Sequence, residues 1–395
     1  TAHEITSAVS QKRTRRASEC REDEFAARCP LTTKDDLVED QRSNPPYGSN
    51  HTEPFSTYTR FCQTSGTTAQ PLAILDTPGS WDWMLANWAQ IYAAAEVQPG
   101  DTVYFAFSFG PFLGFWTAFE AAAKCGFRCL PGGGLTSAAR LRAMIRHRAQ
   151  VLCCTPTYAL HLTEVGASEG IDLRETSIKK IIVAGEPGGG IPAVRKRIRD
   201  GWCGAAVLDH YGMTEVGPVA YERLGEPGHL RVIENSYFAE IIDPKTTKPV
   251  AIGESGELVL TTLGRTACPL LRYRTGDLVR RAATEGFVLD GGIMGRTDDM
   301  IVVRGVNIYP AAVDSVVREV PAIGEYRVRV THRGEMTELT LEAEAEDAAT
   351  IRQLERALTE AFALRIPVAH VTNGTLPRFE LKARRWVTEQ TRAKP

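Results

Sequence analysis

The chain has 395 residues, of which 43% are hydrophobic and 24% charged, and its formal net charge is −2. This length exceeds one ordinary hydrophobic core, so we expect a globular protein of two domains rather than a disordered chain. The charge balance excludes the basic surface that nucleic acid or an anionic membrane would attract.

Nine cysteines are spread along the chain without a C-x-x-C pair. Zinc knuckles and redox dithiols are therefore not expected, and reduced thiols fit a cytoplasmic protein. The N-terminal residues contain no apolar signal core. The longest apolar run, residues 103–123, contains Gly110, Pro111, Gly114 and Glu120, which favours a buried strand, turn and helix over a membrane span.

Strands alternate with helices over the first half of the chain. Thr33 is a candidate N-cap for a short helix from Lys34. Strands are expected at 72–75, 102–107, 127–130, 151–155, 180–184 and 206–209. Helices are expected at 81–95, 117–125, 138–148, 158–166 and 191–202. This alternation predicts a layered α/β body.

The pattern changes twice in the second half. A β-rich section begins near residue 238, with strands expected at 240–243, 256–262 and 270–274. After Gly295 we expect an α+β unit with a strand at 300–304, helices at 311–320 and 348–363, a hairpin of 326–331 with 338–345, and a last strand at 368–372. This unit of about 100 residues is large enough to fold alone. We therefore divide the chain into residues 1–294 and 295–395.

Hydroxyl side chains surround one glycine in the segment Thr64, Ser65, Gly66, Thr67 and Thr68. A glycine lets the backbone approach an anion closely, while N–H and O–H groups point toward it. The pattern G-x-x-x-x-G-K-[ST] is absent, so this would be another kind of phosphate cradle. Composition alone favours a solvated linker, and the motifs downstream decide between the two interpretations.

Six motifs follow this loop in a fixed order. They are AGEP at 184–187, YGMTE at 211–215, GESGEL at 253–258, YRTGD at 273–277, GRTDDM at 295–300 and RGVNIYP at 304–310. With them the chain resembles the adenylate-forming superfamily from about residue 30 to residue 385, and within it the phenylacetate–coenzyme A ligase branch. The resemblance implies an ATP- and carboxylate-binding domain at 1–294 and a small mobile lid at 295–395.

The chemistry of this family accounts for the residue types. A carboxylate is a poor electrophile, and joining it to AMP creates a mixed anhydride with a good leaving group. The acid and the α-phosphate of ATP are both negative, so the site must neutralise charge and hold them in line. A thiol then attacks the acyl carbonyl, giving a thioester and AMP. The resemblance implies coenzyme A as the thiol.

On the phosphate side, the resemblance implies that Thr64, Ser65, Gly66, Thr67 and Thr68 hold the β- and γ-phosphates. Thr214 would contact the α-phosphate, and Glu215 would hold Mg²⁺. Lys382 would bridge the attacking carboxylate and the α-phosphate. A solvated loop carboxylate at Glu215 and a surface lysine in a basic run at Lys382 are the simpler interpretations.

On the nucleoside side, Tyr211 would stack on adenine. The opposite wall and the boundary with the acid would be formed by Ala184, Gly185, Glu186, Pro187, Asp209, His210, Gly212 and Met213. Asp277 would accept hydrogen bonds from both ribose hydroxyls, and Arg296 would bind ribose or phosphate. A core tyrosine is the alternative at Tyr211, while at His210 a satisfied core histidine is as consistent with the sequence as a role in the site.

Two positions would serve the motion of the lid. Asp298 would be the hinge, because a hinge needs a position that absorbs a backbone change. Gly305 would line the tunnel for the thiol after the lid has turned, where a side chain would obstruct it.

Four phenylalanines bracket the break in regular structure at residues 108–114, where the family places its acid: Phe107, Phe109, Phe112 and Phe115. Aromatic walls suit an aryl or arylacetyl group, so an aromatic acid is the predicted substrate. Any one of these side chains is as well explained by filling the core.

The chain departs from the family pattern at Ala69 and Gln70, where Gly-Lys is usual, and at Leu381, where glycine is usual. These departures leave open a different function, that of a non-catalytic relative that binds a nucleotide or acyl group, whereas the presence of Glu215, Asp277 and Lys382 argues against it. The adenylation step could also be kept while the acyl group passes to the phosphopantetheine of an acyl carrier protein or to an amine. His229 lacks cysteine partners, so no structural zinc is expected. The oligomeric state stays open between monomer and homodimer.

Overall fold

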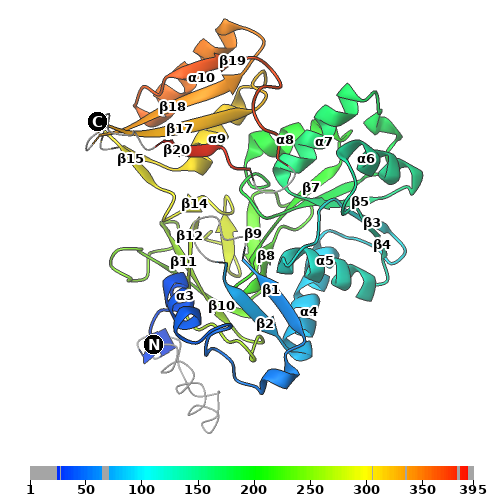
Figure 1. The fold of residues 1–395 in the computed structure, drawn as a ribbon, viewed down its shortest axis with the longest axis vertical. Helices are drawn as coiled ribbons and strands as arrows, with labels where there is room; N and C mark the ends of the chain where they lie inside the picture. The colour runs from blue at the N-terminus through cyan, green and yellow to red at the C-terminus, as the bar shows by residue number, and fades with distance from the viewer. Residues whose placement is uncertain are drawn as a thin grey trace.

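The structure is a computed structural model that describes residues 25–26, 28–64, 71–304, 306–333, 336–379 and 383–389. A large α/β body carries a β-rich section, and a small α+β domain lies above it in Figure 1. The predicted fold class is therefore confirmed. Among the described helices, none is both long and apolar enough to cross a bilayer.

The body is organised by an eight-stranded sheet in the order β13-β9-β8-β7-β6-β5-β3-β4. Strands β4, β3, β5, β6 and β7 run parallel, whereas β8, β9 and β13 continue the sheet antiparallel. Their bounds are β3 (Thr102–Phe105), β4 (Arg128–Pro131), β5 (Val151–Cys154), β6 (Lys180–Val183), β7 (Ala206–Met213), β8 (Gly217–Tyr221), β9 (His229–Val232) and β13 (Val288–Asp290).

Helices cover both faces of the parallel part, which explains why its central strands β3, β5 and β6 are mostly apolar. In β3, Val103 and Phe105 enter the core beneath α4 (Pro78–Ala94) and α5 (Leu113–Lys124). Tyr104 points to the opposite core, beneath α6 (Ser137–Arg146), α7 (Pro156–Ser168) and α8 (Pro192–Gly201). This alternation follows from the two-residue period of a strand, and Figure 1 shows the two helical layers.

The β-rich section is a four-stranded antiparallel sheet, β10-β11-β12-β14, with strands β10 (Tyr237–Ile242), β11 (Ser255–Thr262), β12 (Tyr273–Arg280) and β14 (Gly295–Arg296). A two-stranded ribbon, β1 (Arg60–Gln63) with β2 (Ala73–Asp76), leads into and out of the hydroxyl loop. Helix α3 (Lys34–Ser43) precedes the ribbon, and two short 3-10 turns, η1 (Phe55–Thr57) and η2 (Leu173–Glu175), lie in connections.

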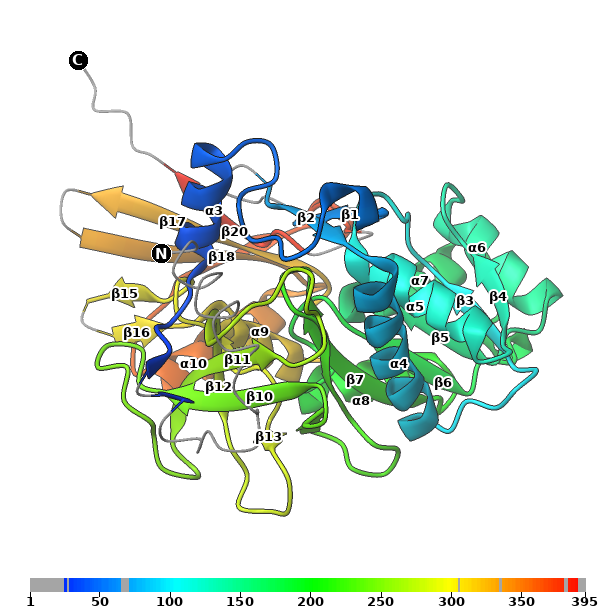
Figure 2. The ribbon, with the colours of Figure 1, turned by 90° about the horizontal axis from the view of Figure 1, so that it is seen from below.

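The small domain begins with a hairpin of β15 (Ile301–Val303) and β16 (Val306–Ile308). Its four-stranded sheet, β19-β18-β17-β20, contains β17 (Tyr326–Arg333), β18 (Met336–Glu344), β19 (Val368–Val371) and β20 (Trp386–Glu389). Helices α9 (Pro310–Glu319) and α10 (Ala348–Phe362) lie against this sheet (Figure 2), and their apolar faces form a separate core with it.

Several predicted elements need correction. Helix α5 begins at Leu113 rather than at 117. Gly114, which we expected to precede the helix, lies in its first turn, where backbone N–H groups have no partner within the helix. Strand β12 begins at Tyr273, three residues later than expected. The strand expected at 368–372 is confirmed as β19, but it is not the last strand, since β20 follows it. Strand β20 pairs in parallel with the distant β17, and such pairing leaves little local signal. The cap at Thr33 is confirmed, with Asp36 completing a capping box.

A buried ion pair connects three segments of the body. The guanidinium of Arg265 faces the carboxylate of Asp76 at the end of β2, and these side chains are 0% and 1% exposed. The Nη1 atom of Arg265 also donates to the carbonyl oxygens of Thr214 and Glu215, at 2.8 Å each. One side chain therefore fixes the position of the ribbon relative to the turn after β7.

Replacing Arg265 with methionine would leave the Asp76 carboxylate buried without its partner. Breaking a buried pair on one side costs roughly 3–5 kcal/mol, so we expect a loss of that size in the free energy of unfolding, measured with urea. Arg280→Met is the control, because its pair with Asp290 is partly exposed, at 41% and 39%, and such pairs contribute about 0–1 kcal/mol. Equal losses in the two variants would contradict the assigned role of Arg265.

Candidate active site

The predicted site residues gather at the carboxyl ends of the parallel strands. Phe107 and Phe109 follow β3, residues 184–187 follow β6, and residues 209–213 form the last part of β7. In this sheet the strand order reverses at β3, which has β4 on one side and β5 on the other, and open α/β sheets bind ligands outside the carboxyl ends of their strands at such a reversal. The fold therefore brings together segments that are far apart in the sequence.

Three predicted nucleotide residues contact one another directly. The hydroxyl of Tyr211 donates to Oδ2 of Asp277 at 2.6 Å, and Nη1 of Arg296 lies 3.3 Å from Oδ1. Tyr211 and Asp277 are buried, and Arg296 is half-buried. Burial, and then the neighbouring Asp277 carboxylate, raises the pKa of Tyr211 well above its usual value, so its hydroxyl keeps its proton and donates. We call Tyr211, Asp277 and Arg296 the ribose triad, after the role proposed below.

Two glycines permit these close approaches. A Cβ atom on Gly276 would lie 2.8 Å from Nη2 of Arg296, and its φ of +75° is a conformation that favours glycine. A Cβ atom on Gly212 would lie 2.7 Å from the carbonyl oxygen of Gly217 across the β7–β8 hairpin. Both motif glycines therefore serve backbone geometry.

Of the predicted phosphate loop, the structure describes Thr64, while residues 65–68 and the departures Ala69 and Gln70 lie outside the described residues. Thr64 N donates to the carbonyl of Leu72 at 3.1 Å, and Thr64 Oγ1 accepts from Leu72 N at 3.0 Å. These bonds close the base of the loop. The neighbouring Gln63 N donates to the carbonyl of Pro111 at 2.8 Å, which joins the ribbon to the phenylalanine segment.

Thr214 and Glu215 occupy the turn between β7 and β8, where Arg265 holds their carbonyl oxygens. The Glu215 side chain is 8% exposed, and Nζ of Lys34 lies 3.2 Å from its Oε1. This carboxylate therefore already faces a cation. No group of three metal-ligating side chains occurs among the described residues, so a metal here would take its other ligands from phosphate and water. Mg²⁺ binds in that manner, and Glu215 fits it.

Glu186 has a contact that its motif did not predict. Its Oε1 accepts from Thr157 N in the first turn of α7 at 2.9 Å, and its Oε2 accepts from Ala383 N of the small domain at 2.9 Å. A carboxylate is favourable at a helix N-terminus. Ala184 is half-buried, whereas Gly185 and Pro187 are exposed, and these three stay predictions as part of the adenine wall.

His210 is buried in the protein, whereas Asp209 is half-buried. His210 Nδ1 bonds to the carbonyl of Ala220 at 3.0 Å, its ring packs on Trp88, and burial lowers its pKa to about 4. This environment is that of a satisfied core histidine. Burial, and then the Glu222 carboxylate, raises the pKa of Asp209 to about 8. Glu222 pairs with Arg195 and accepts from Asp209 N at 2.7 Å.

The four predicted phenylalanines form one aromatic cluster. The rings of Phe107 and Phe115 are stacked with centroids 4.2 Å apart. Phe109 meets Phe107 edge to face at 5.4 Å, and Phe112 meets Phe115 at 5.9 Å. Phe107 is buried, whereas the other three are half-buried. The cluster thus has an inner part in the core and an outer part that a ligand can reach.

The lid positions are only partly described. Asp298 is exposed and forms a bidentate pair with Arg296, with distances of 2.8 and 3.0 Å. Gly305, Leu381 and Lys382 lie outside the described residues. The roles assigned to all of these positions stay predictions.

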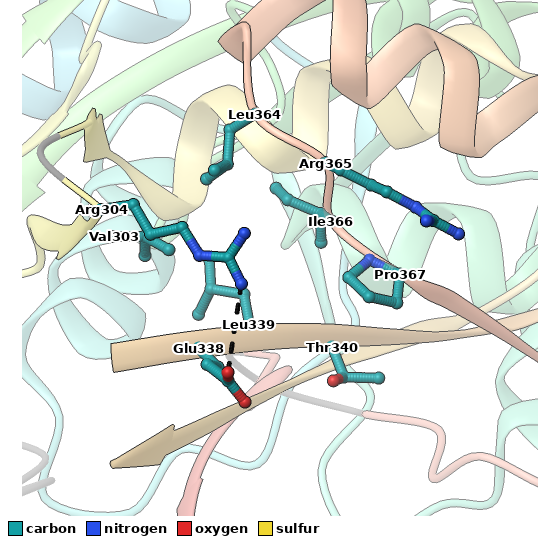
Figure 3. A pocket seen from close by; sticks show the side chains of 9 residues that line it. All are labelled: Val303, Arg304, Glu338, Leu339, Thr340, Leu364, Arg365, Ile366 and Pro367. Atoms are coloured by element: carbon teal, nitrogen blue, oxygen red, sulfur yellow. Dashed lines mark ion pairs between the residues drawn. The ribbon is translucent and has the colours of Figure 1, made fainter. Parts of the chain in front are cut away.

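A hollow of about 360 Å³ lies within the small domain itself (Figure 3). Val303 and Arg304 line it on one side, and residues 338–340 and 364–367 line the rest. Arg304 lies 4.0 Å from Glu338 across its mouth. None of its lining residues belongs to the predicted nucleotide or acyl site.

The sequence did not reveal the charged side chains whose ion pairs hold the segments around the predicted site in place. They are Lys34, Asp76, Glu164, Arg195, Glu222, Arg265, Arg378 and Arg385. Isolated charged residues carry no motif, and their partners lie far away in the chain.

Residues 6–266 match the family described as AMP-binding enzyme, and residues 305–390 match its C-terminal domain. A phenylacetate-coenzyme A ligase of Thermus thermophilus is 33% identical over 328 residues, covering 81% of this chain and 72% of the relative. The structure of 2-hydroxyisobutyryl-CoA ligase in the postadenylation state, in complex with R3-HIB-AMP, has a TM-score of 0.88 at 29% identity. In the thioesterification state with 2-HIB-AMP and CoA, that ligase scores 0.68. Both alignments cover 93% of this chain and 81% of the ligase.

The raised pKa of Asp209 predicts a pH dependence of stability. The folded state holds a proton there up to about pH 8, whereas the unfolded state loses it near the ordinary aspartate pKa of 3.8. Stability from this group is therefore full below the unfolded value and falls by about 1.4 kcal/mol per pH unit until pH rises through the folded value. Asp209→Asn removes this pH dependence.

The test is urea denaturation of wild type and Asp209→Asn between pH 5 and 9. The variant should gain stability relative to wild type as pH rises, and the difference should level off above about pH 8. The partly exposed Asp290→Asn is the control and should follow the wild-type profile. A constant difference between Asp209→Asn and wild type would contradict the assignment.

Proposed function

The chain belongs to the AMP-binding enzyme family, and on this basis we propose that it is an AMP-forming acid–thiol ligase acting on an aromatic carboxylic acid. It would join the acid to AMP, release pyrophosphate, and transfer the acyl group to coenzyme A. The observation that carries this proposal is the ribose triad, which places a buried carboxylate beside an aromatic ring and a guanidinium at the carboxyl end of β7.

The ribose triad suits a nucleoside. The Asp277 carboxylate has two oxygens, and both now accept from protein donors that ribose hydroxyls would replace or share. Arg296 would turn one of its donors toward ribose or phosphate. The face of Tyr211 would lie against adenine, with residues 184–187 as the opposite wall.

The phosphate side supports the reaction through fixed geometry. Thr214 would contact the α-phosphate, and the loop that begins at Thr64 would hold the β- and γ-phosphates. Arg265 keeps the Thr214 turn at a set distance from the ribbon that carries this loop. Preorganised donors stabilise the charge that develops when the carboxylate attacks phosphorus. Lys382 would hold the acid and the α-phosphate together.

Glu215 would hold Mg²⁺, and Lys34 would give up its contact when the metal binds. When bound, the ion would neutralise charge on the phosphate oxygens and favour departure of pyrophosphate. The burial of Glu215 keeps its carboxylate fixed for this purpose.

The aromatic cluster supports an aryl or arylacetyl acid. Phe109, Phe112 and Phe115 are half-buried at the carboxyl end of β3 and would offer ring faces and edges to an aromatic group. The phenylacetate-coenzyme A ligase of Thermus thermophilus, with which this chain shares 33% identity, supports the same class. A small acid such as acetate would leave these rings without contacts.

Acid-dependent exchange of labelled pyrophosphate into ATP tests the proposal. With a panel of aryl, arylacetyl and alkyl acids, we expect exchange to be fastest with aromatic acids and at least tenfold slower with acetate, because one buried ring is worth a few kcal/mol. Lys382→Ala is the control and should abolish exchange.

Three results would redirect the proposal. Equal exchange with acetate and aromatic acids would reject the substrate class. Exchange without thioester formation on coenzyme A would favour a carrier protein or an amine as the acceptor. Absence of exchange with every acid would favour a non-catalytic binding relative.

A second prediction concerns Asp277. Asp277→Asn should raise the KM for ATP roughly 10- to 100-fold, because hydrogen bonds to a charged group are worth about 1.5–3 kcal/mol. Asp290→Asn, on the neighbouring β13 and partly exposed, should leave the KM unchanged. An unchanged KM in Asp277→Asn would show that this carboxylate does not contact the nucleotide.

A further inference from the structure

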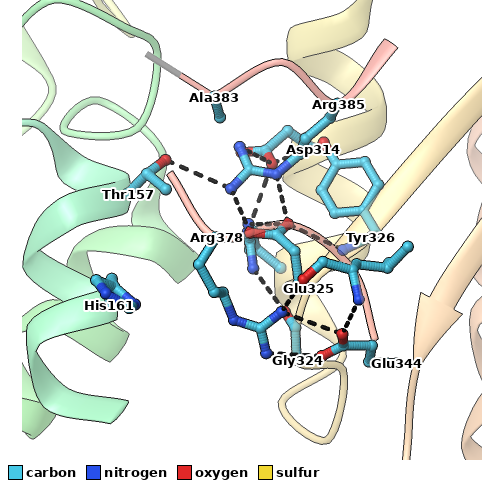
Figure 4. A network of polar contacts seen from close by, with 12 residues as sticks. Thr157, His161, Asp314, Gly324, Glu325, Tyr326, Glu344, Arg378, Ala383 and Arg385 are labelled. Carbon is cyan, nitrogen blue, oxygen red and sulfur yellow. Dashed lines mark hydrogen bonds and ion pairs between the residues drawn. The ribbon is translucent and has the colours of Figure 1, made fainter. Parts of the chain in front are cut away.

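Polar contacts cross the interface between the body and the small domain on both sides of residues 380–382, and Figure 4 shows one of them, between Arg385 and Thr157. Arg378 Nε donates to Glu164 Oε2 on α7 at 3.0 Å. Arg385 Nη2 lies 3.4 Å from Thr157 Oγ1 at the start of the same helix. Ala383 N donates to Glu186 of the predicted adenine wall at 2.9 Å. We call these three contacts the docking clamp.

Each arginine of the docking clamp also has a partner within its own domain. Arg378 forms a bidentate pair with Glu344, whose side chain is 0% exposed, at 2.7 and 3.1 Å. Arg385 pairs with Glu325, at 2.6 and 3.1 Å, and its guanidinium lies over the ring of Tyr326. If the small domain moved away, neither arginine would be left buried without a carboxylate. Separation would therefore avoid the main cost of breaking a buried pair.

The contacts that body residues make in the docking clamp are weak enough for the small domain to separate from the body. Glu164 is 44% exposed, and exposed pairs contribute little each. At the same interface, Nη1 of Arg197 on α8 is buried with no hydrogen-bond partner in the described part of the chain. Burial, and then nearby Arg318 of the small domain, lowers the pKa of Arg197. The carboxylates of Glu164, Glu325 and Asp314 oppose this shift. The unpaired Nη1 donor still carries a desolvation cost, which offsets part of the gain from docking.

The overall arrangement matches one state of a related ligase better than another. At equal coverage, the similarity is higher to the postadenylation state than to the thioesterification state. The docking clamp is thus present in a body-to-domain arrangement of the postadenylation kind.

We propose that Glu164 is a positioning residue that, through Arg378, docks the small domain for the adenylation half-reaction and is released for thiol transfer. This inference rests on the proposed function. In the sequence Arg378 lies four residues before Lys382 and Ala383 one residue after it, so the docking clamp holds the described chain on both sides of that position. Thr157 and Glu186 complete the docking clamp on the body.

The experiment measures the two half-reactions separately in Glu164→Gln and Glu164→Arg. Pyrophosphate exchange should fall about two- to fivefold in Glu164→Gln and about tenfold or more in Glu164→Arg, where like charges face each other. Transfer from preformed acyl-adenylate to coenzyme A, in a single turnover, should be unchanged or faster. Glu169→Gln is the matched control, because Glu169 is similarly exposed but pairs with Arg142 within the body.

Equal loss in both half-reactions, or no loss in either, would overturn the proposal. A second readout does not depend on activity: amide hydrogen exchange of residues 376–389 should be faster in Glu164→Arg than in wild type and unchanged in Glu169→Gln. If the wild type shows no pyrophosphate exchange with any acid, the proposed function fails, while this second readout still decides whether the docking clamp exists. Unchanged amide exchange in Glu164→Arg would show that the docking clamp does not hold the small domain on the body.

Discussion

The buried pair of Asp76 and Arg265 is the constraint on which the candidate site depends. Asp76 ends the ribbon that carries the hydroxyl loop, and Arg265 holds the carbonyl oxygens of the Thr214 turn. The loop and the turn are 150 residues apart in the chain, taking Thr64 and Thr214 as their markers. A charged pair with fixed donor geometry sets their separation more sharply than apolar packing would, because guanidinium and carboxylate meet in defined orientations.

The remaining parts of the site follow from the sheet. The residues that follow parallel strands lie at one edge of the sheet, so the phenylalanines, residues 184–187 and Tyr211 come together there. The β-rich section brings Asp277 to Tyr211, and Arg296 follows on the neighbouring β14. Because β14 is the last strand before the small domain, Arg296 and Asp298 lie where the two domains join. The predicted nucleotide site is therefore directly connected to the junction between the two domains.

Much of the fold could be predicted from the sequence, because the strands of the parallel sheet are short apolar runs between amphipathic helices. The strands that were missed, among them β8, β9 and β20, are stabilised by partners distant in the chain and have weak local patterns. Motifs identified Tyr211, Asp277 and Arg296, which the structure brings together. They gave no sign that Glu186 bonds the small domain or that Lys34 faces Glu215, because isolated charges reveal nothing of their partners.

Direct detection of the intermediate shows whether this chain activates an aromatic acid with ATP. The protein would be mixed with α-labelled ATP, Mg²⁺ and an aryl acid without any thiol, quenched, and examined for enzyme-bound acyl-adenylate. We expect an acyl-adenylate to accumulate only when the acid is present, and coenzyme A to discharge it to AMP and a thioester. Recovery of unchanged ATP with every aromatic acid would contradict the proposed function.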